Sequence, residues 1–220
     1  MFLLLAALAF GGSMLVRWWL NRTYSKWRQV PNAVGANGAQ VARFILAKNN
    51  LQHVRLEASK GELSDHYVPS QDLLRLSEPI HAESTVAALA VAAHEVGHAI
   101  QDAENYPPLK WKASLMPMAM AGNNIGMMMA LGGGLLGASA MVDMGLLMFA
   151  VALLMPVLTL PIEFDASKRA LAELEQAGLV DQRDYDGAKS MLTAAALTYV
   201  AGATTSLAMA AFILLRFIRR

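Results

Sequence analysis

Four long apolar stretches, separated by polar segments, dominate the hydropathy pattern of this chain of 220 residues. A helix needs about 20 predominantly apolar residues to cross the hydrocarbon core of a bilayer. The pattern therefore predicts a mostly α membrane protein with about four transmembrane helices, at residues 1–22, 113–142, 143–162 and 191–218.

The first stretch has a second interpretation, because Ala7-Leu8-Ala9 has the small-x-small form of a signal-peptide cleavage site. A signal peptide also carries a basic region before its apolar run. This chain has no such region, and the run before Ala7 is short. Trp18 and Trp19 instead follow the apolar run, with Arg22 close behind, as at a membrane interface. We therefore expect a transmembrane helix here.

Residues 23–112 have the composition of a water-soluble segment. Apolar spacing predicts an amphipathic helix in this segment, and alternation predicts short strands with a third strand or its turn between them. A longer helix follows, whose first half is rich in alanine and valine. The expected elements are the helix at 41–51, strands at 54–57 and 73–77, the third strand or turn within 62–69, and the long helix at 84–102. Together they predict a small α+β head.

The second apolar stretch contains two pairs of glycines at small-xxx-small spacing, Gly122 with Gly126 and Gly133 with Gly137. Such pairs allow close packing of helices, although chance in a glycine-rich stretch explains them equally well. The chain becomes charged again at residues 163–190, where a helix is expected to run from 163 to 177 and to end at Gly178.

Four crossings would place the two polar segments, 23–112 and 163–190, on the same side of the membrane. Basic residues near helix ends are more frequent on that side, which indicates the cytoplasm. The basic C-terminus argues the other way. The two groups are Arg17, Arg22, Lys26, Arg28, Lys110, Lys112, Lys168, Arg169 and Lys189 on one side, and Arg216, Arg219 and Arg220 on the other.

Composition narrows the class of function. Hydrophobic residues make up 55% of the chain and charged residues 16%, against about 25% charged in a soluble domain. The net charge of +1 gives no reason to expect a nucleic-acid partner. Because the chain has no cysteine, any metal site must use histidine and carboxylate ligands.

The motif His94-Glu95-Val96-Gly97-His98 lies inside the long expected helix. Residues four apart project from one helix face, so the two imidazoles can hold one Zn²⁺ ion. Glu95 is rotated away from that line and can act as a general base on a water molecule at the metal. A buried histidine satisfied by hydrogen bonds is the alternative for either imidazole.

A third ligand would distinguish a catalytic zinc site from a two-histidine motif that arose by chance. Glu163 is our choice, at the start of the second polar segment. It could equally be an acid at a helix N-terminus after Pro161, favoured by the helix dipole. Asp165 is the competing ligand.

The chain resembles the YugP-like membrane zinc metallopeptidases over nearly its whole length. The resemblance is carried by LSDHYVP (63–69), LRLSE (74–78), AAHEVGHAIQDAE (92–104), LTLPIEFDASKRAL (158–171) and AALTYVAGA (195–203). It implies a gluzincin-like head with zinc held by His94, His98 and Glu163, and Glu95 as the catalytic base.

At one position the chain differs from two other groups of membrane proteases. The HtpX-like and CAAX-prenyl proteases place an aspartate four residues after the third ligand, where this chain has Ser167. Asp102 or Asp165 could take over the role of orienting a ligand histidine, or either could be a solvated acid.

The mechanism expected from this resemblance is peptide hydrolysis. Zinc would activate water and polarise the scissile carbonyl, and Glu95 would move the proton. The oxyanion needs a further donor, for which the candidates are His66, Tyr67, Tyr199 and Arg169. His66 could instead be a surface turn residue, and Tyr199 a packing residue.

These observations predict an integral membrane zinc endopeptidase, in a bacterial inner membrane, acting on peptides or proteins at the bilayer surface. The main alternative is a membrane scaffold or partner-binding module with a structural metal site, for which Glu95 would not be required. A small channel or transporter is weakly supported, because the apolar stretches contain no central charged relay.

Overall fold

The computed structural model describes residues 2–218, without the side chains of residues 2–10, 212, 214 and 216–218. The chain divides into two compact units. The head unit consists of Leu15–Tyr106 and Ile162–Thr198, and the apolar unit of Met1–Met14, Pro107–Pro161 and Tyr199–Arg220. Three long helices contribute residues to both units: α1 (Phe2–Arg28), α8 (Met155–Gln176) and α9 (Gln182–Ile218).

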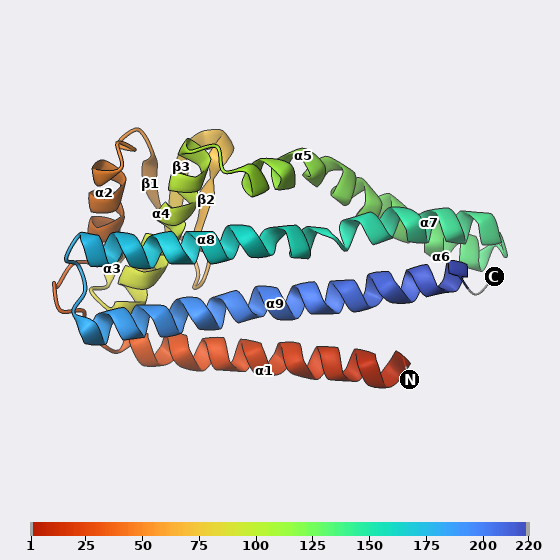
Figure 1. Cartoon of the computed structure of the whole chain (residues 1–220), viewed down its shortest axis with the longest axis horizontal. Helices are drawn as coiled ribbons and strands as arrows, with labels where there is room; N and C mark the ends of the chain where they lie inside the picture. The colour runs from red at the N-terminus through yellow and green to blue at the C-terminus, as the bar shows by residue number, and fades with distance from the viewer. Residues whose placement is uncertain (1, 219–220) are drawn as a thin grey trace. The chain divides into compact units, whose positions relative to one another are not determined.

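The head unit contains a three-stranded sheet of order β1-β3-β2 (Figure 1). Its strands are β1 (Arg55–Ser59), β2 (His66–Val68) and β3 (Leu73–Ser77). β3 pairs in parallel with β1 and antiparallel with β2, which is followed by the 3-10 turn η1 (Pro69–Gln71). The two predicted strands are confirmed, and the segment between them does contain a third.

Three helices complete the sequence of the head before Tyr106: α2 (Gly38–Lys48), α3 (Glu78–Ala82) and α4 (Val86–Ala103). α2 confirms the predicted amphipathic helix with earlier bounds, because Asn37 and Gln40 form a capping box at its start. α4 begins where the Thr85 side chain accepts a hydrogen bond from the Ala88 N–H.

α4 is the centre of the head core. Most of its residues are buried, and the cluster around them draws side chains from α1, α2, the sheet, α8 and α9. Its many alanines leave little side-chain bulk, so neighbouring elements can approach closely. At Gly97 an added Cβ would lie 2.7 Å from the backbone oxygen of Ala166 on α8. α8 therefore packs directly against the backbone of the motif helix.

The apolar unit contains α5 (Pro107–Ala121), the π-helical turn η2 (Gly122–Gly126), α6 (Met127–Leu135) and α7 (Ser139–Ala152). Figure 1 shows α6 and α7 side by side. Glycines mark the contacts of η2 and α6 with α7. An added Cβ at Gly126 in η2 would lie 2.7 Å from the Gly145 oxygen, and one at Gly133 in α6 would lie 2.8 Å from the Val142 nitrogen. An added Cβ at Gly122 would lie closer still, 2.3 Å from the Met148 backbone oxygen.

The glycine spacing thus reflects helix packing at three of the four positions. Gly137 differs: nothing would crowd a Cβ there, and its φ of 68° places it in the left-handed region, in the turn between α6 and α7.

The expectation of four membrane spans is corrected. Among the described residues, two helical stretches are long and apolar enough to cross a membrane, Ser139–Gln176 and Gln182–Ala211. The predicted span at 113–142 is divided by η2 and ends at the turn after Leu135, which leaves α5 with 15 residues and α6 with 9. The predicted span at 1–22 falls partly outside the described side chains.

Candidate metal centre

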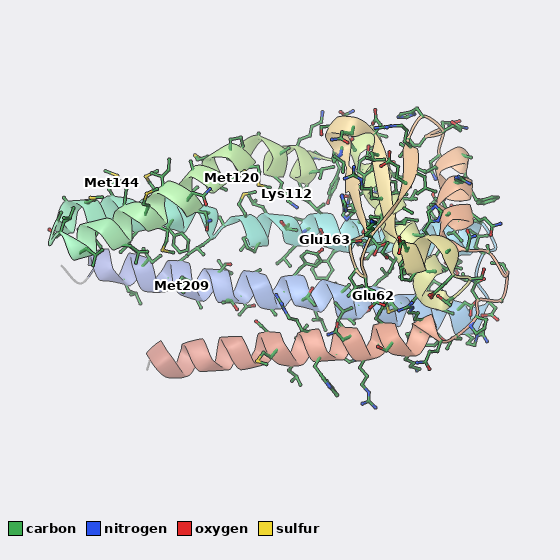
Figure 2. The ribbon with its side chains drawn as sticks, turned by 180° about the vertical axis from the view of Figure 1, so that it is seen from behind. Glu62, Lys112, Met120, Met144, Glu163 and Met209 are labelled. Atoms are coloured by element: carbon green, nitrogen blue, oxygen red, sulfur yellow. The ribbon has the colours of Figure 1, made fainter. Side chains whose placement is uncertain are left out.

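Three side chains from two helices meet in the head unit. His94 and His98 extend from successive turns of α4, and Glu163 extends from α8, where Figure 2 labels it. The Oε2 atom of Glu163 lies 3.3 Å from the Nε2 atom of His94 and 3.7 Å from that of His98. One possible ligand atom from each residue lies within 4.8 Å of the other two. The fold therefore brings the expected ligand set together.

These three groups fit a metal ion. Their side chains are only 12%, 16% and 8% exposed in the order His94, His98, Glu163. Oε2 of Glu163 is buried, and the described residues donate no hydrogen bond to it. A buried carboxylate oxygen that accepts no hydrogen bond is unfavourable, and a cation shared by the three groups would remove that cost. Two imidazoles and one carboxylate are a donor set that suits Zn²⁺.

The charges around His98 also favour a cation. Burial by itself lowers the pKa of this imidazole, but Glu163 and Glu95 raise it, and the net pKa is above its usual range. Positive charge is thus stabilised at the point where the histidines and the glutamate meet.

Glu163 is not an acid at a helix N-terminus. α8 begins at Met155 and continues through Pro161, so Glu163 lies more than two turns inside the helix. The helix dipole acts mainly on side chains in the first turn. The dipole interpretation of Glu163 is therefore wrong.

Glu95 is buried beside the cluster, with 8% of its surface exposed. Burial raises the pKa of its carboxyl group, and the charges of His98 and His94 oppose that rise. Glu95 lies on the same helix, one residue after His94 and three before His98. Its position directly after His94 turns it away from the line that joins the two imidazoles.

Each histidine has a partner at the nitrogen that faces away from Glu163. The Oγ atom of Ser167 lies 3.2 Å from the Nδ1 atom of His94. For His98 that partner is Gln101, whose Oε1 atom lies 3.0 Å from Nδ1. Ser167, which stands where the HtpX-like and CAAX-prenyl proteases have an aspartate, is thus in contact with a candidate ligand.

The two aspartates considered from the sequence have other partners. Asp102 accepts a hydrogen bond from the Tyr67 hydroxyl at 3.0 Å. Asp165 accepts hydrogen bonds from Gln101 and Arg169 at 2.8 and 2.5 Å, and it is not a member of the ligand cluster. The structure therefore favours Glu163 over Asp165 as the third ligand.

Comparison with known proteins identifies the family. Residues 2–219 match the family described as "putative neutral zinc metallopeptidase". The chain is also 37% identical over 218 residues to a Bacillus subtilis protein named "Putative membrane protease YugP". The aligned region covers 99% of this chain and 95% of that protein. The chain belongs to this zinc metallopeptidase family. No solved structure matches it significantly.

The description of the family names zinc, and the cluster of His94, His98 and Glu163 could hold a metal ion. The four candidate oxyanion donors of this family member lie in different surroundings. His66 is exposed on edge strand β2, with Nδ1 2.7 Å from the Ser64 carbonyl oxygen. Arg169 forms ion pairs with Asp165 and Glu104.

The other two candidates are tyrosines. The Tyr67 hydroxyl donates to Asp102, so it is already engaged. Tyr199 lies on α9 in the apolar unit and is 38% exposed. The role of His66 or Tyr199 as oxyanion donor stays a prediction.

Sequence reasoning missed Gln101 and Asp65. Gln101 is completely buried, which is unusual for glutamine, and the signal for it was its place three residues after His98 on the same helix. Asp65 accepts hydrogen bonds from the backbone N–H and the hydroxyl of Ser77, at 2.7 and 3.0 Å. Burial raises the pKa of Asp65, and its charge in turn raises the pKa of Glu95.

Proposed function

We propose that this protein is an integral membrane zinc endopeptidase that hydrolyses peptide bonds in peptides or membrane-associated proteins. The observation that carries the proposal is the meeting of His94, His98 and Glu163, with buried Glu95 beside them. Three protein ligands with one open position are typical of catalytic zinc, whereas structural sites usually have four. The described residues supply three such groups in this cluster.

The residues divide the chemistry between them. His94, His98 and Glu163 would hold zinc, which would supply a Lewis acid able to lower the pKa of water and to polarise the scissile carbonyl group. Glu95 takes the proton from the attacking water and delivers it to the departing amine.

Two features support a substrate at the bilayer surface. Glu163 belongs to α8, which is part of the candidate membrane span Ser139–Gln176. The apolar unit exposes large hydrophobic side chains, including Leu135 at 90% and, in Figure 2, Met120 and Met144. Large exposed apolar surfaces mark membrane or protein contacts. The distribution of basic residues supports a site on the cytoplasmic side of a bacterial inner membrane.

The test is a comparison of purified wild type with Glu95→Gln. We expect the variant to retain about one zinc ion per chain, because Glu95 is not a ligand, while cleavage of a casein-derived peptide falls by about 10²- to 10⁴-fold. Glu57→Gln, at an exposed position on β1, is the matched control and should cleave normally. Undiminished cleavage by Glu95→Gln would contradict the mechanism.

The third ligand is tested separately with Glu163→Ala. Removing one of three ligands should strongly weaken zinc binding, as measured by competition with a chromogenic chelator. Normal zinc content and affinity in this variant would mean that another group completes the site.

A further inference from the structure

Gln101 is a buried polar side chain whose hydrogen bonds all reach the candidate metal centre or its supports. Its Oε1 atom lies 3.0 Å from Nδ1 of His98, and its Nε2 atom donates to the Ile162 carbonyl and to Asp165, both at 2.8 Å. The side chain is 0% exposed. Burial shields these bonds from bulk solvent, so each of them constrains the others.

The partners determine which way the carboxamide points. The Ile162 carbonyl can only accept a hydrogen bond. The Oδ2 atom of Asp165 is also an acceptor here, because the Arg169 Nε–H, which can only donate, points at this same oxygen from 2.5 Å. The amide NH₂ group must therefore face these two acceptors, which leaves only the amide oxygen for His98.

The amide oxygen in turn determines the protonation pattern of the imidazole. An oxygen acceptor 3.0 Å from Nδ1 requires a proton on that nitrogen. In the neutral ring, Nε2 then carries a lone pair, and Nε2 is the atom that faces Glu163. Hydrogen bonds at the remote nitrogen are the usual means of fixing the tautomer of a metal-binding histidine.

We propose that Gln101 is a positioning residue for the metal centre, and that Asp165 acts through it. Asp165 orients the Gln101 carboxamide, and the carboxamide holds His98 as the tautomer with Nε2 free for a metal. The same side chain holds the backbone carbonyl of Ile162, directly before Glu163, so it connects ligands on α4 and α8. The proposal rests on the proposed function only in taking zinc as the metal.

Sequence spacing would have given this role to Asp102, one turn after His98. Asp102 is instead paired with Tyr67 on β2. It is therefore the comparison residue: a carboxylate adjacent to Gln101 on the same helix, whose hydrogen bond goes to Tyr67 rather than to a candidate ligand.

The first measurement is zinc affinity of folded protein, by chelator competition, for wild type, Gln101→Met and Asp102→Asn. Methionine keeps the length and the unbranched shape of glutamine but offers no oxygen. We expect Gln101→Met to bind zinc about 10- to 100-fold more weakly, as is usual when a partner of a ligand histidine is lost, and Asp102→Asn to change by less than about threefold. Equal affinity of Gln101→Met and wild type would overturn the proposal.

The second measurement reads the tautomer directly in metal-free protein. With only five histidines in the chain, ¹⁵N-histidine spectra at alkaline pH can resolve His98, assigned by its loss in His98→Gln. We expect the Nδ1–H tautomer in wild type and a shift toward Nε2–H in Gln101→Met. Asp165→Asn removes one of the two acceptors that fix the carboxamide, while the Ile162 carbonyl remains. This variant should therefore shift the tautomer in the same direction by a smaller amount, and it serves as the test if Gln101→Met does not fold.

The two measurements separate the proposals. A wild type that binds no zinc would contradict the proposed function, while the His98 tautomer would still report on Gln101. If wild type binds zinc and cleaves peptide but the His98 tautomer is unchanged in both variants, the inference about Gln101 and Asp165 is wrong and the proposed function stands.

Discussion

The two candidate ligand histidines have partners of different kinds. Gln101 is a buried amide on the same helix as His98, whereas Ser167 is a hydroxyl on the neighbouring helix that meets His94. A serine hydroxyl can accept from Nδ1 and can also donate to a further acceptor. It therefore constrains the ring of His94 less strictly than the carboxamide constrains His98.

This difference leads to a prediction for Ser167→Ala. Loss of one neutral hydrogen bond costs about 0.5–1.5 kcal/mol, so zinc affinity should fall by about 3- to 10-fold, less than in Gln101→Met. Isothermal titration with zinc would measure it. Ser167→Asp keeps an acceptor near Nδ1 and should bind at least as tightly as Ser167→Ala. A loss as large as that of Glu163→Ala would show that Ser167 does more than orient His94.

At the scale of elements, the site depends on how closely α4 and α8 approach. The ligands come from both helices, and the contact between them is made by the backbone of Gly97 against Ala166. Any side chain at position 97 would have to push α8 away, and Glu163 lies less than one turn from Ala166. Gly97 in the motif is thus a packing residue with a direct consequence for ligand geometry.

We therefore expect Gly97→Ala to weaken zinc binding by at least tenfold and to lower the melting temperature, because its Cβ would overlap a backbone oxygen that cannot rotate away. Gly202→Ala is the matched control, since that helical glycine on α9 has nothing within 4 Å of an added Cβ. It should be neutral or stabilising by up to about 1 kcal/mol. Normal zinc binding by Gly97→Ala would mean that the helices separate without disturbing the ligands.

At the scale of the whole molecule, zinc should stabilise the head core. The ligands come from two helices that both contribute to this core, and a ligand that binds only the folded state adds about 2.7 kcal/mol at 100 times its Kd. For a chain of this size that corresponds to a rise in Tm of about 5–10 °C. Thermal melts in detergent with and without a chelator would measure the shift. His94→Ala should show no such shift, and a chelator effect that persisted in it would point to a different metal site.

Membrane orientation gives a second prediction at this scale. Because the chain has no cysteine, single introduced cysteines report accessibility without background. We expect Lys60→Cys, in the exposed loop after β1, to resist a membrane-impermeant maleimide in intact bacterial cells and to react after permeabilisation. Ser139→Cys, at the far end of the candidate span Ser139–Gln176, should react in intact cells. The opposite pattern would place the site outside the cytoplasm.

Features that depend on neighbours in the chain were predictable from the sequence. The motif helix, the amphipathic α2 and the strands follow from periodicity, and the two histidines share a face because helical geometry puts residues four apart together. The bounds of α2 shifted because the capping side chains of Asn37 and Gln40 set its start. The expected span at 113–142 failed because hydropathy does not register a π-turn or a glycine in the left-handed region.

The sequence by itself determined that two histidines and a glutamate lie on one buried helix, because those positions follow from local helix geometry. Only the tertiary structure decided what completes and orients the site. Glu163 is a candidate ligand inside α8 rather than a helix-terminal acid, and Gln101, not Asp102, contacts His98. These roles depend on which face of α8 packs on α4 across more than 60 residues of chain, and no local pattern encodes that contact.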